Sequence, residues 1–194
     1  MSALLLALPL ALLPQAKATR PAPAPEPTFT YDFIQVGYIT TDYDLIDEAS
    51  DGMSFLASYD ITDHVNLVAS YSFDSIEVGG VESDARRLTF GAGLHTPLHE
   101  RLDIYGQASF ITEEAEMAGM AQRDTGFGAE AGFRYMPVYR VELIAAVVHT
   151  DVVDSSTNLG LGARGYLTDG LSLGFDAVFD SDRNAYGINL RYGF

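Results

Sequence analysis

Apolar side chains fall at every second position through most of this chain, and that period restricts the fold more than any other feature. The clearest stretch covers residues 65–74, where the apolar set is Val65, Leu67, Ala69, Tyr71 and Phe73. Period two indicates a β-strand with two different faces. Ten such segments follow one another between residues 28 and 194. Each has about the nine to eleven residues that a tilted strand needs to cross a bilayer.

Two kinds of connection alternate between these segments. Short polar stretches predict tight turns at 62–64, 96–100, 136–138 and 168–170. Longer acidic stretches predict loops at 42–51, 75–84, 113–124, 151–157 and 181–184. Short turns at one end and long loops at the other are typical of a transmembrane barrel, so we predict a closed antiparallel up-and-down β-barrel. We expect Asp47, Glu116 and Asp154 in loops at one end, and Asp63 and Asp169 in turns at the other.

A soluble antiparallel sandwich would also alternate, and it is the main competing fold. It would bury its apolar face and expose its polar one. The non-apolar face here is dominated by Gly, Ser, Asn and a few isolated charges, which does not resemble a solvated protein surface. Tyr and Phe also recur near the segment ends, as the aromatic girdles of a membrane barrel require.

The N-terminus has the features of an export signal. Residues 3–13 form an apolar run that is too short to span a membrane as a helix, and Ala16-Lys17-Ala18 fits the small-x-small cleavage rule. A buried N-terminal helix is the alternative. A Pro-rich stretch follows, which favours extended polyproline II. We therefore predict a signal peptide at 1–18, a periplasmic spacer at 19–27 and a barrel at 28–194.

The last residues carry an alternating apolar pattern that ends in an aromatic residue. The pattern consists of Tyr186, Ile188, Leu190, Tyr192 and Phe194. Together with the export signal and the alternating connections, it resembles the small bacterial outer-membrane β-barrel family, the OmpX- and OmpA-like membrane barrels. The resemblance implies a Gram-negative outer membrane, periplasmic termini, and a last strand that the barrel-assembly machinery reads. Those relatives have eight strands, so eight is the alternative to the ten counted here.

If the apolar face contacts lipid, the other face lines the lumen. The charged and amide side chains on that face are Asp60, Arg87, Asp103, Gln107, Glu130, Arg134, Arg140, Glu142, Arg164, Asp176, Asn189 and Arg191. A charge in a narrow lumen is costly unless it is paired and hydrogen-bonded. We therefore expect a salt-bridge network of Arg87, Asp103, Glu130, Arg134, Glu142, Arg164, Asp176 and Arg191. Partners should come from adjacent strands, with Glu130 near an arginine such as Arg164 or Arg140.

Glycines on the same inward face allow two interpretations of the lumen. Gly162 and Gly174 are examples. They could leave room for ions, as in a lined pore. They could equally make room for arginine and tyrosine side chains from neighbouring strands and let the sheet curve. A barrel of ten strands is little wider than one that side chains fill, which disfavours a large diffusion pore.

Composition excludes several classes of function. Eleven Lys and Arg against 27 Asp and Glu give a net charge of −16, which disfavours nucleic-acid binding. The absence of Cys excludes disulfides, thiolate zinc sites and a cysteine nucleophile. The acidic cluster at 42–51 lacks the glycine and glutamate of a calcium loop. We expect no catalytic residue, no metal site and no cofactor.

One histidine keeps an enzymatic alternative open. His149 is placed near the loop end, as the catalytic histidine of an outer-membrane lipid hydrolase would be, although Asp151 stands where a serine is often found. His64, His95 and His99 do not have metal-ligand spacing.

These features lead to one preferred function and two alternatives. We expect a non-enzymatic integral outer-membrane barrel with a mostly filled polar lumen and acidic surface loops, in a structural or surface-recognition role. Its partners would be outer-membrane lipid, lipopolysaccharide and the barrel-assembly machinery. The alternatives are a narrow, porin-like, cation-favouring channel and a lipid-directed hydrolase centred on His149.

Overall fold

The computed structural model describes residues 29–43, 49–78, 81–117 and 120–194. The predicted signal peptide, the predicted spacer and Asp47 lie outside these residues. The strands are β1 (Phe33–Tyr43), β2 (Ala49–Thr62), β3 (Val65–Val78), β4 (Val81–His99), β5 (Leu102–Met117), β6 (Met120–Val138), β7 (Val141–Asp151), β8 (Ser155–Tyr166), β9 (Leu171–Phe179) and β10 (Arg183–Gly193). The part of the chain described contains no helix long and apolar enough to cross a membrane.

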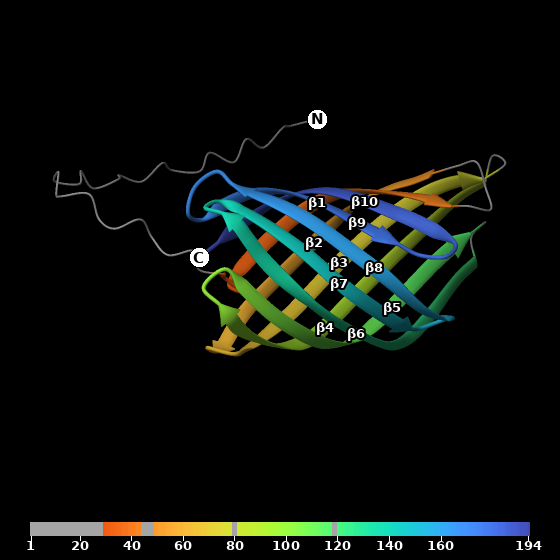
Figure 1. Ribbon diagram of the computed structural model, residues 1–194. Helices are drawn as coiled ribbons and strands as arrows, with labels where there is room; N and C mark the ends of the chain where they lie inside the picture. The colour runs from red at the N-terminus through yellow and green to blue at the C-terminus, as the bar shows by residue number, and fades with distance from the viewer. Residues whose placement is uncertain (1–28, 44–48, 79–80, 118–119) are drawn as a thin grey trace, which may run out of the picture.

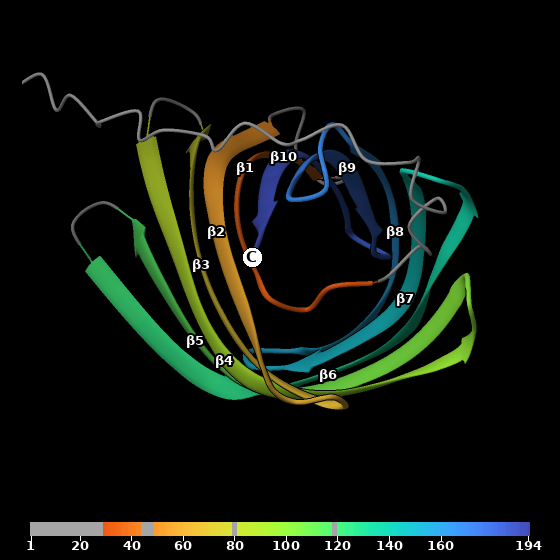
Figure 2. The ribbon, with the colours of Figure 1, turned by 90° about the vertical axis from the view of Figure 1, so that its left-hand side faces the viewer.

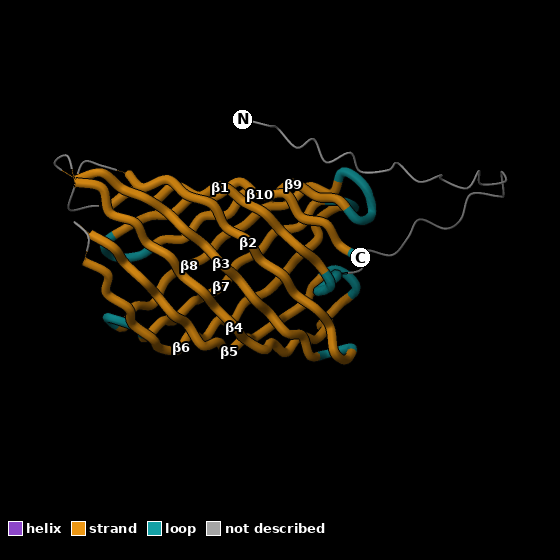
Figure 3. The backbone as a smooth tube through the Cα atoms, turned by 180° about the vertical axis from the view of Figure 1, so that it is seen from behind, coloured by secondary structure: helices purple, strands orange, loops and turns teal. Residues whose placement is uncertain are grey.

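Consecutive strands pair antiparallel, and the first strand pairs with the last (Figure 1). Along this closing seam, Phe33 lies opposite Gly193 and Tyr43 lies opposite Arg183. The strands are inclined to the barrel axis, as the lattice of crossing strands in Figure 3 makes visible. The predicted closed ten-stranded barrel is therefore confirmed.

The two faces of the sheet have opposite character. Large apolar side chains such as Phe90, Phe127 and Leu190 are exposed on the outer surface. Buried side chains include charged ones, among them Arg134 and Glu142. This is the inverse of a water-soluble domain and rules out the sandwich alternative, because exposed apolar residues on every strand need an apolar solvent around the barrel.

Two of the predicted acidic loops are strand. Residues 75–78, 81–84, 113–117 and 120–124 extend β3 to β6 beyond the segment lengths expected, so that β4 and β6 have 19 residues each while β9 has 9. The charges pair across the strands here: Arg87 with Glu113, and Arg86 Nη1 with Glu114 Oε1 at 4.0 Å. Glu116 consequently lies in β5, and its predicted place in a loop is wrong. A run of charges indicates solvent exposure. Both a loop and a strand that extends beyond the bilayer provide that exposure, so the charges do not distinguish the two.

The short turns are present, but two of them are displaced along the chain. β4 continues to His99 and β6 to Val138, so these turns fall at 100–101 and 139–140 rather than at the predicted 96–100 and 136–138. Asp63 and Asp169 lie in connections between strands at this end, as predicted, while Asp154 lies in the connection between β7 and β8 at the other end.

Both ends of the described chain meet at the short-turn end. Gly193 N donates to Gly170 O (2.7 Å), and Phe194 N donates to Asp32 O (3.2 Å). The segment 29–32, which precedes β1, does not continue the barrel wall. Figure 2 shows it running across the opening of the barrel, and we refer to it as the N-terminal strap.

Candidate functional site

The lumen next to the N-terminal strap is filled by a buried ion pair and its hydrogen-bond partners. Arg134 Nε on β6 donates to Glu142 Oε1 on β7 (2.5 Å), and the Tyr166 hydroxyl on β8 donates to Glu142 Oε2 (2.5 Å). Arg134 is 4% and Glu142 0% exposed. Because both carboxylate oxygens accept a hydrogen bond and a guanidinium balances the charge, the cluster meets the conditions for a buried ion pair. It joins three consecutive strands of the barrel wall.

Two further arginines converge on one neutral acceptor. Arg191 Nε (2.9 Å) and Arg164 Nη2 (3.2 Å) both donate to Gln35 Oε1 on β1. The Arg191 guanidinium also lies over the Phe33 ring, 3.6 Å from its centroid. Neither arginine forms an ion pair with a carboxylate among the described residues. Gln35 was not singled out from the sequence.

The inward glycines make room for this cluster. A Cβ atom at Gly174 would lie 2.7 Å from Asn189 Oδ1 and 3.2 Å from an Arg164 nitrogen, and one at Gly162 would lie 2.7 Å from Asp176 Oδ1. Any side chain at these two positions would displace a lumen group. The space that these glycines leave is thus occupied by side chains of neighbouring strands.

The remaining predicted network residues are arranged differently from the prediction. Glu130 Oε1 accepts a hydrogen bond from the Tyr105 hydroxyl (2.6 Å), and Asp176 Oδ2 accepts one from Asn189 Nδ2 (2.6 Å). Glu130 forms no ion pair with an arginine in the part of the chain described. The expected placement of Arg140 in the lumen is wrong: it lies in the turn after β6 with a positive φ of 70° and contacts Asp169.

Arg140 illustrates why period two fails near a turn. The alternation holds only while the backbone is extended, and the left-handed conformation of Arg140 ends it. Its side chain points into solvent, 45% exposed.

Of the eight residues expected to form the lumen network, only Arg134 and Glu142 form an ion pair with each other within the described ranges.

The N-terminal strap is held against the lumen by side chains of several strands. The Tyr31 hydroxyl donates to Asp103 Oδ2 (2.9 Å), and its ring stacks on His95 at a centroid distance of 3.7 Å. Arg134 Nη1 donates to Thr30 O (3.1 Å), and its guanidinium lies over the Tyr31 ring. Burial raises the pKa of the Tyr31 phenol, so the hydroxyl remains a donor.

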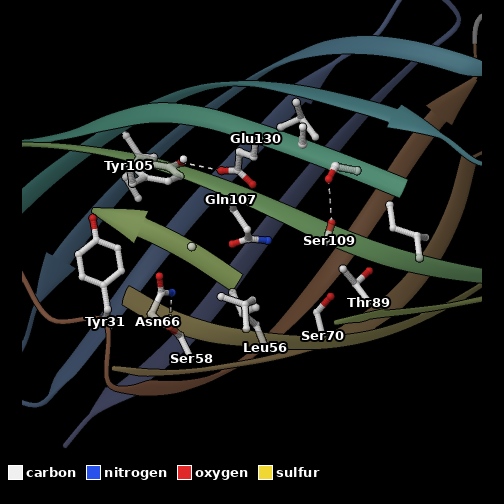
Figure 4. A pocket seen from close by; sticks show the side chains of 18 of the residues that line it. Tyr31, Leu56, Ser58, Asn66, Ser70, Thr89, Tyr105, Gln107, Ser109 and Glu130 are labelled. Carbon is white, nitrogen blue, oxygen red and sulfur yellow. Dashed lines mark hydrogen bonds between the residues drawn. The ribbon is translucent and has the colours of Figure 1, made fainter. Parts of the chain in front are cut away.

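Between the strap and the loop end, the lumen contains a cavity of about 290 Å³ (Figure 4). Glu130, Gln107 and Ser109 lie along its wall from β5 and β6, with Leu56 on the opposite side in this view. Arg87 also lines it. Two further hollows, of about 310 and 670 Å³, continue toward the loop end, and both have Arg87 and Thr150 among their lining residues.

The histidines of the described residues are spread over different places in the barrel. His149 is exposed on the outer face of β7, where its Nδ1 lies 2.9 Å from the Thr157 hydroxyl. His95 Nε2 lies 3.1 Å from Asp60 Oδ1 at the strap end. No group of three or more potential ligands gathers among these residues.

The C-terminal motif lies on the outer face of the last strand. Ile188, Leu190, Tyr192 and Phe194 are exposed there, and Tyr186 is half-buried against Phe179. The strand that carries them pairs with β1 and closes the barrel. Their pattern in the sequence is therefore consistent with an apolar seam on the outer surface.

A closed barrel with an apolar exterior and a polar, partly filled lumen is the architecture of an integral outer-membrane protein. The model of the outer membrane protein beta-barrel domain family matches residues 2–194. The chain belongs to this family.

Solved structures share the fold at low sequence identity. The chain is similar to Neisserial surface protein A (NspA), with a TM-score of 0.50, 13% identity, and coverage of 84% of this chain and 96% of the other. It is similar to an outer membrane channel from Pseudomonas putida F1, with a TM-score of 0.53, 11% identity, and coverage of 87% and 97%. The NanC porin gives a TM-score of 0.53 at 8% identity, with coverage of 83% and 100%. Among curated proteins, none matches.

Proposed function

We propose that this outer-membrane barrel is closed to diffusion and has a structural or surface-recognition role. The observation that carries the proposal is the obstruction at the strap end, where the Arg134–Glu142 pair and Tyr31 fill the lumen. These buried, hydrogen-bonded side chains would have to move before solutes could pass.

The proposed orientation places both termini and the short turns in the periplasm. The predicted export signal supports it, as does the usual arrangement of bacterial barrels, with short periplasmic turns and longer outer loops. The charged strand extensions, including Arg86 and Glu114, would then stand at the cell surface beside lipopolysaccharide. The terminal residues Tyr186 to Phe194 would be read by the barrel-assembly machinery during insertion.

Planar-bilayer recordings of the purified protein test the closed state. We expect no stepwise conductance from the native barrel in bilayers that record steps from a known porin. Steady steps from the native protein would refute the proposal. A matched variant, Arg134→Ala with Glu142→Ala, removes part of the obstruction and should raise the frequency of openings, while Arg140→Ala in the exposed turn should not.

A narrow cation-favouring channel is the second candidate, because three hollows follow one another from the loop end to the strap. Its signature would be conductance with a reversal potential that favours cations across a salt gradient. The lipid-hydrolase alternative has weaker support, since the His149 side chain meets a threonine hydroxyl on the outer surface. A lipid-modification assay on His149→Ala tests it directly.

A further inference from the structure

The floor of the lumen cavity carries guanidinium donors that have no acceptor. Arg191 is 8% exposed and uses only its Nε, toward Gln35, while it forms no ion pair among the described residues. Arg191 and Arg134 both line the cavity of about 290 Å³. Unpaired donors of a charged group are costly, and an anionic oxygen in the cavity would satisfy those of Arg191.

An apolar band lies in the same cavity. It consists of Leu56, Val68, Ile111, Ile144 and Val148, whose side chains face inward from β2, β3, β5 and β7. Their inward position differs from the polar lumen expected for a barrel of this family. Apolar walls with a few convergent polar groups are the usual composition of a small-molecule site.

Among the described residues, the two ends of the cavity are bounded differently. Toward the loop end, the further hollows continue past Arg87 and Thr150. Toward the other end, the N-terminal strap and the Tyr31–Asp103 hydrogen bond close it. A ligand would therefore enter from the loop end and stop at the arginines.

We propose that this cavity binds a small monocarboxylate with an apolar body. The carboxylate accepts hydrogen bonds from the two Nη groups of Arg191, since its two oxygens match a guanidinium group. The hydrocarbon part lies against the apolar band. Glu130, on the wall of the same cavity with only Tyr105 as its partner, disfavours a second negative charge on the ligand. This goes beyond the closed-barrel role, because a pocket with one entrance binds without conducting.

Calorimetric titration of the refolded barrel in detergent, with a micelle-only blank, tests the proposal. The probes are hexanoate, hexanol, hexylammonium and sulfate. We expect saturable binding of hexanoate alone. Arg191→Gln should weaken it about ten- to a hundredfold, as the loss of charge-assisted hydrogen bonds would. Retained heat-modifiable gel mobility shows that the variant is folded.

A second pair of variants separates the cavity from the outer surface. Val68→Phe enlarges a side chain in the apolar band and should abolish binding, whereas Leu67→Phe makes the same kind of change on the outer face, where Leu67 is exposed. Equal binding of hexanol and hexanoate, binding of sulfate as tight as hexanoate, or unchanged binding by the folded Val68→Phe variant would each overturn the proposal.

Discussion

Replacing Arg134 by alanine should be the most destabilising single change in the lumen. The substitution removes the hydrogen bond from Arg134 Nε to Glu142 and the one from Nη1 to Thr30 O. It leaves Glu142, which is 0% exposed, with Tyr166 as its one remaining donor. The buried carboxylate thereby loses the charge that balanced it.

The magnitude follows from the burial of the pair. Removing one partner of a buried ion pair costs about 3–5 kcal/mol, because the remaining charge is left uncompensated. For a urea dependence of about 1–3 kcal/mol per molar, this corresponds to a midpoint lowered by at least about 1 M. The double variant Arg134→Ala, Glu142→Ala should recover part of the loss, since no charge then remains unpaired.

Urea titration of the refolded barrel, followed by circular dichroism and by heat-modifiable gel mobility, measures the change. Arg140→Ala is the matched control, because the ion pair of Arg140 with Asp169 is exposed at 3.5 Å and surface pairs contribute little. If Arg134→Ala unfolds at the same urea concentration as the Arg140→Ala control, the buried ion pair does not stabilise the barrel.

Three other predictions test the topology, the last strand and the strap. A cysteine in place of Asp154 should react with an impermeant thiol reagent on intact cells, and one in place of Asp169 should not; labelling at 169 from outside would reverse the orientation. Deleting Phe194 should lower the yield in the outer membrane far more than refolding in detergent, and equal yields would show that this residue is not an assembly signal. Tyr31→Phe removes the one hydrogen bond that the buried Asp103 carboxylate accepts among the described residues, at a cost of about 1–3 kcal/mol in the free energy of unfolding; an unchanged urea midpoint would mean that this contact of the strap does not stabilise the barrel.

The sequence predicts the barrel well because the fold is determined by a repeated local signal. Side-chain direction alternates along every extended strand, so that Phe73 faces outward and Ser72 inward without reference to any distant residue. Strand ends are predicted less well. Charges at 113–116 indicate water, and water surrounds both a loop and a strand that continues above the bilayer.

The partners of lumen residues are not predictable in the same way. Which inward groups meet depends on strand inclination and on side-chain length, and neither follows from period two. Glu130 thus has Tyr105 as its partner rather than an arginine, and Arg191 meets Gln35 from the opposite end of the chain. The strap was missed for another reason: Phe29, Tyr31 and Phe33 alternate with polar residues just as a strand does. The contacts of residues 29–32 with Arg134 and Asp103, which join segments far apart in sequence, are not visible in that pattern.

The scarcity of lysine in this chain has a physical explanation in the lumen. Lys17, in the predicted signal peptide, is the only lysine. Arg134 donates to a carboxylate through Nε and to a backbone carbonyl through Nη1, while its planar face covers the Tyr31 ring. Arg191 likewise donates through Nε while its face lies on Phe33. A lysine ammonium is a single, strongly hydrated centre. It cannot donate hydrogen bonds within one fixed plane and stack on an aromatic ring at the same time. The lumen is too narrow to hydrate each charge fully. Groups on neighbouring strands can accept the hydrogen bonds of an arginine there, which accounts for arginine rather than lysine as the cation of the lumen.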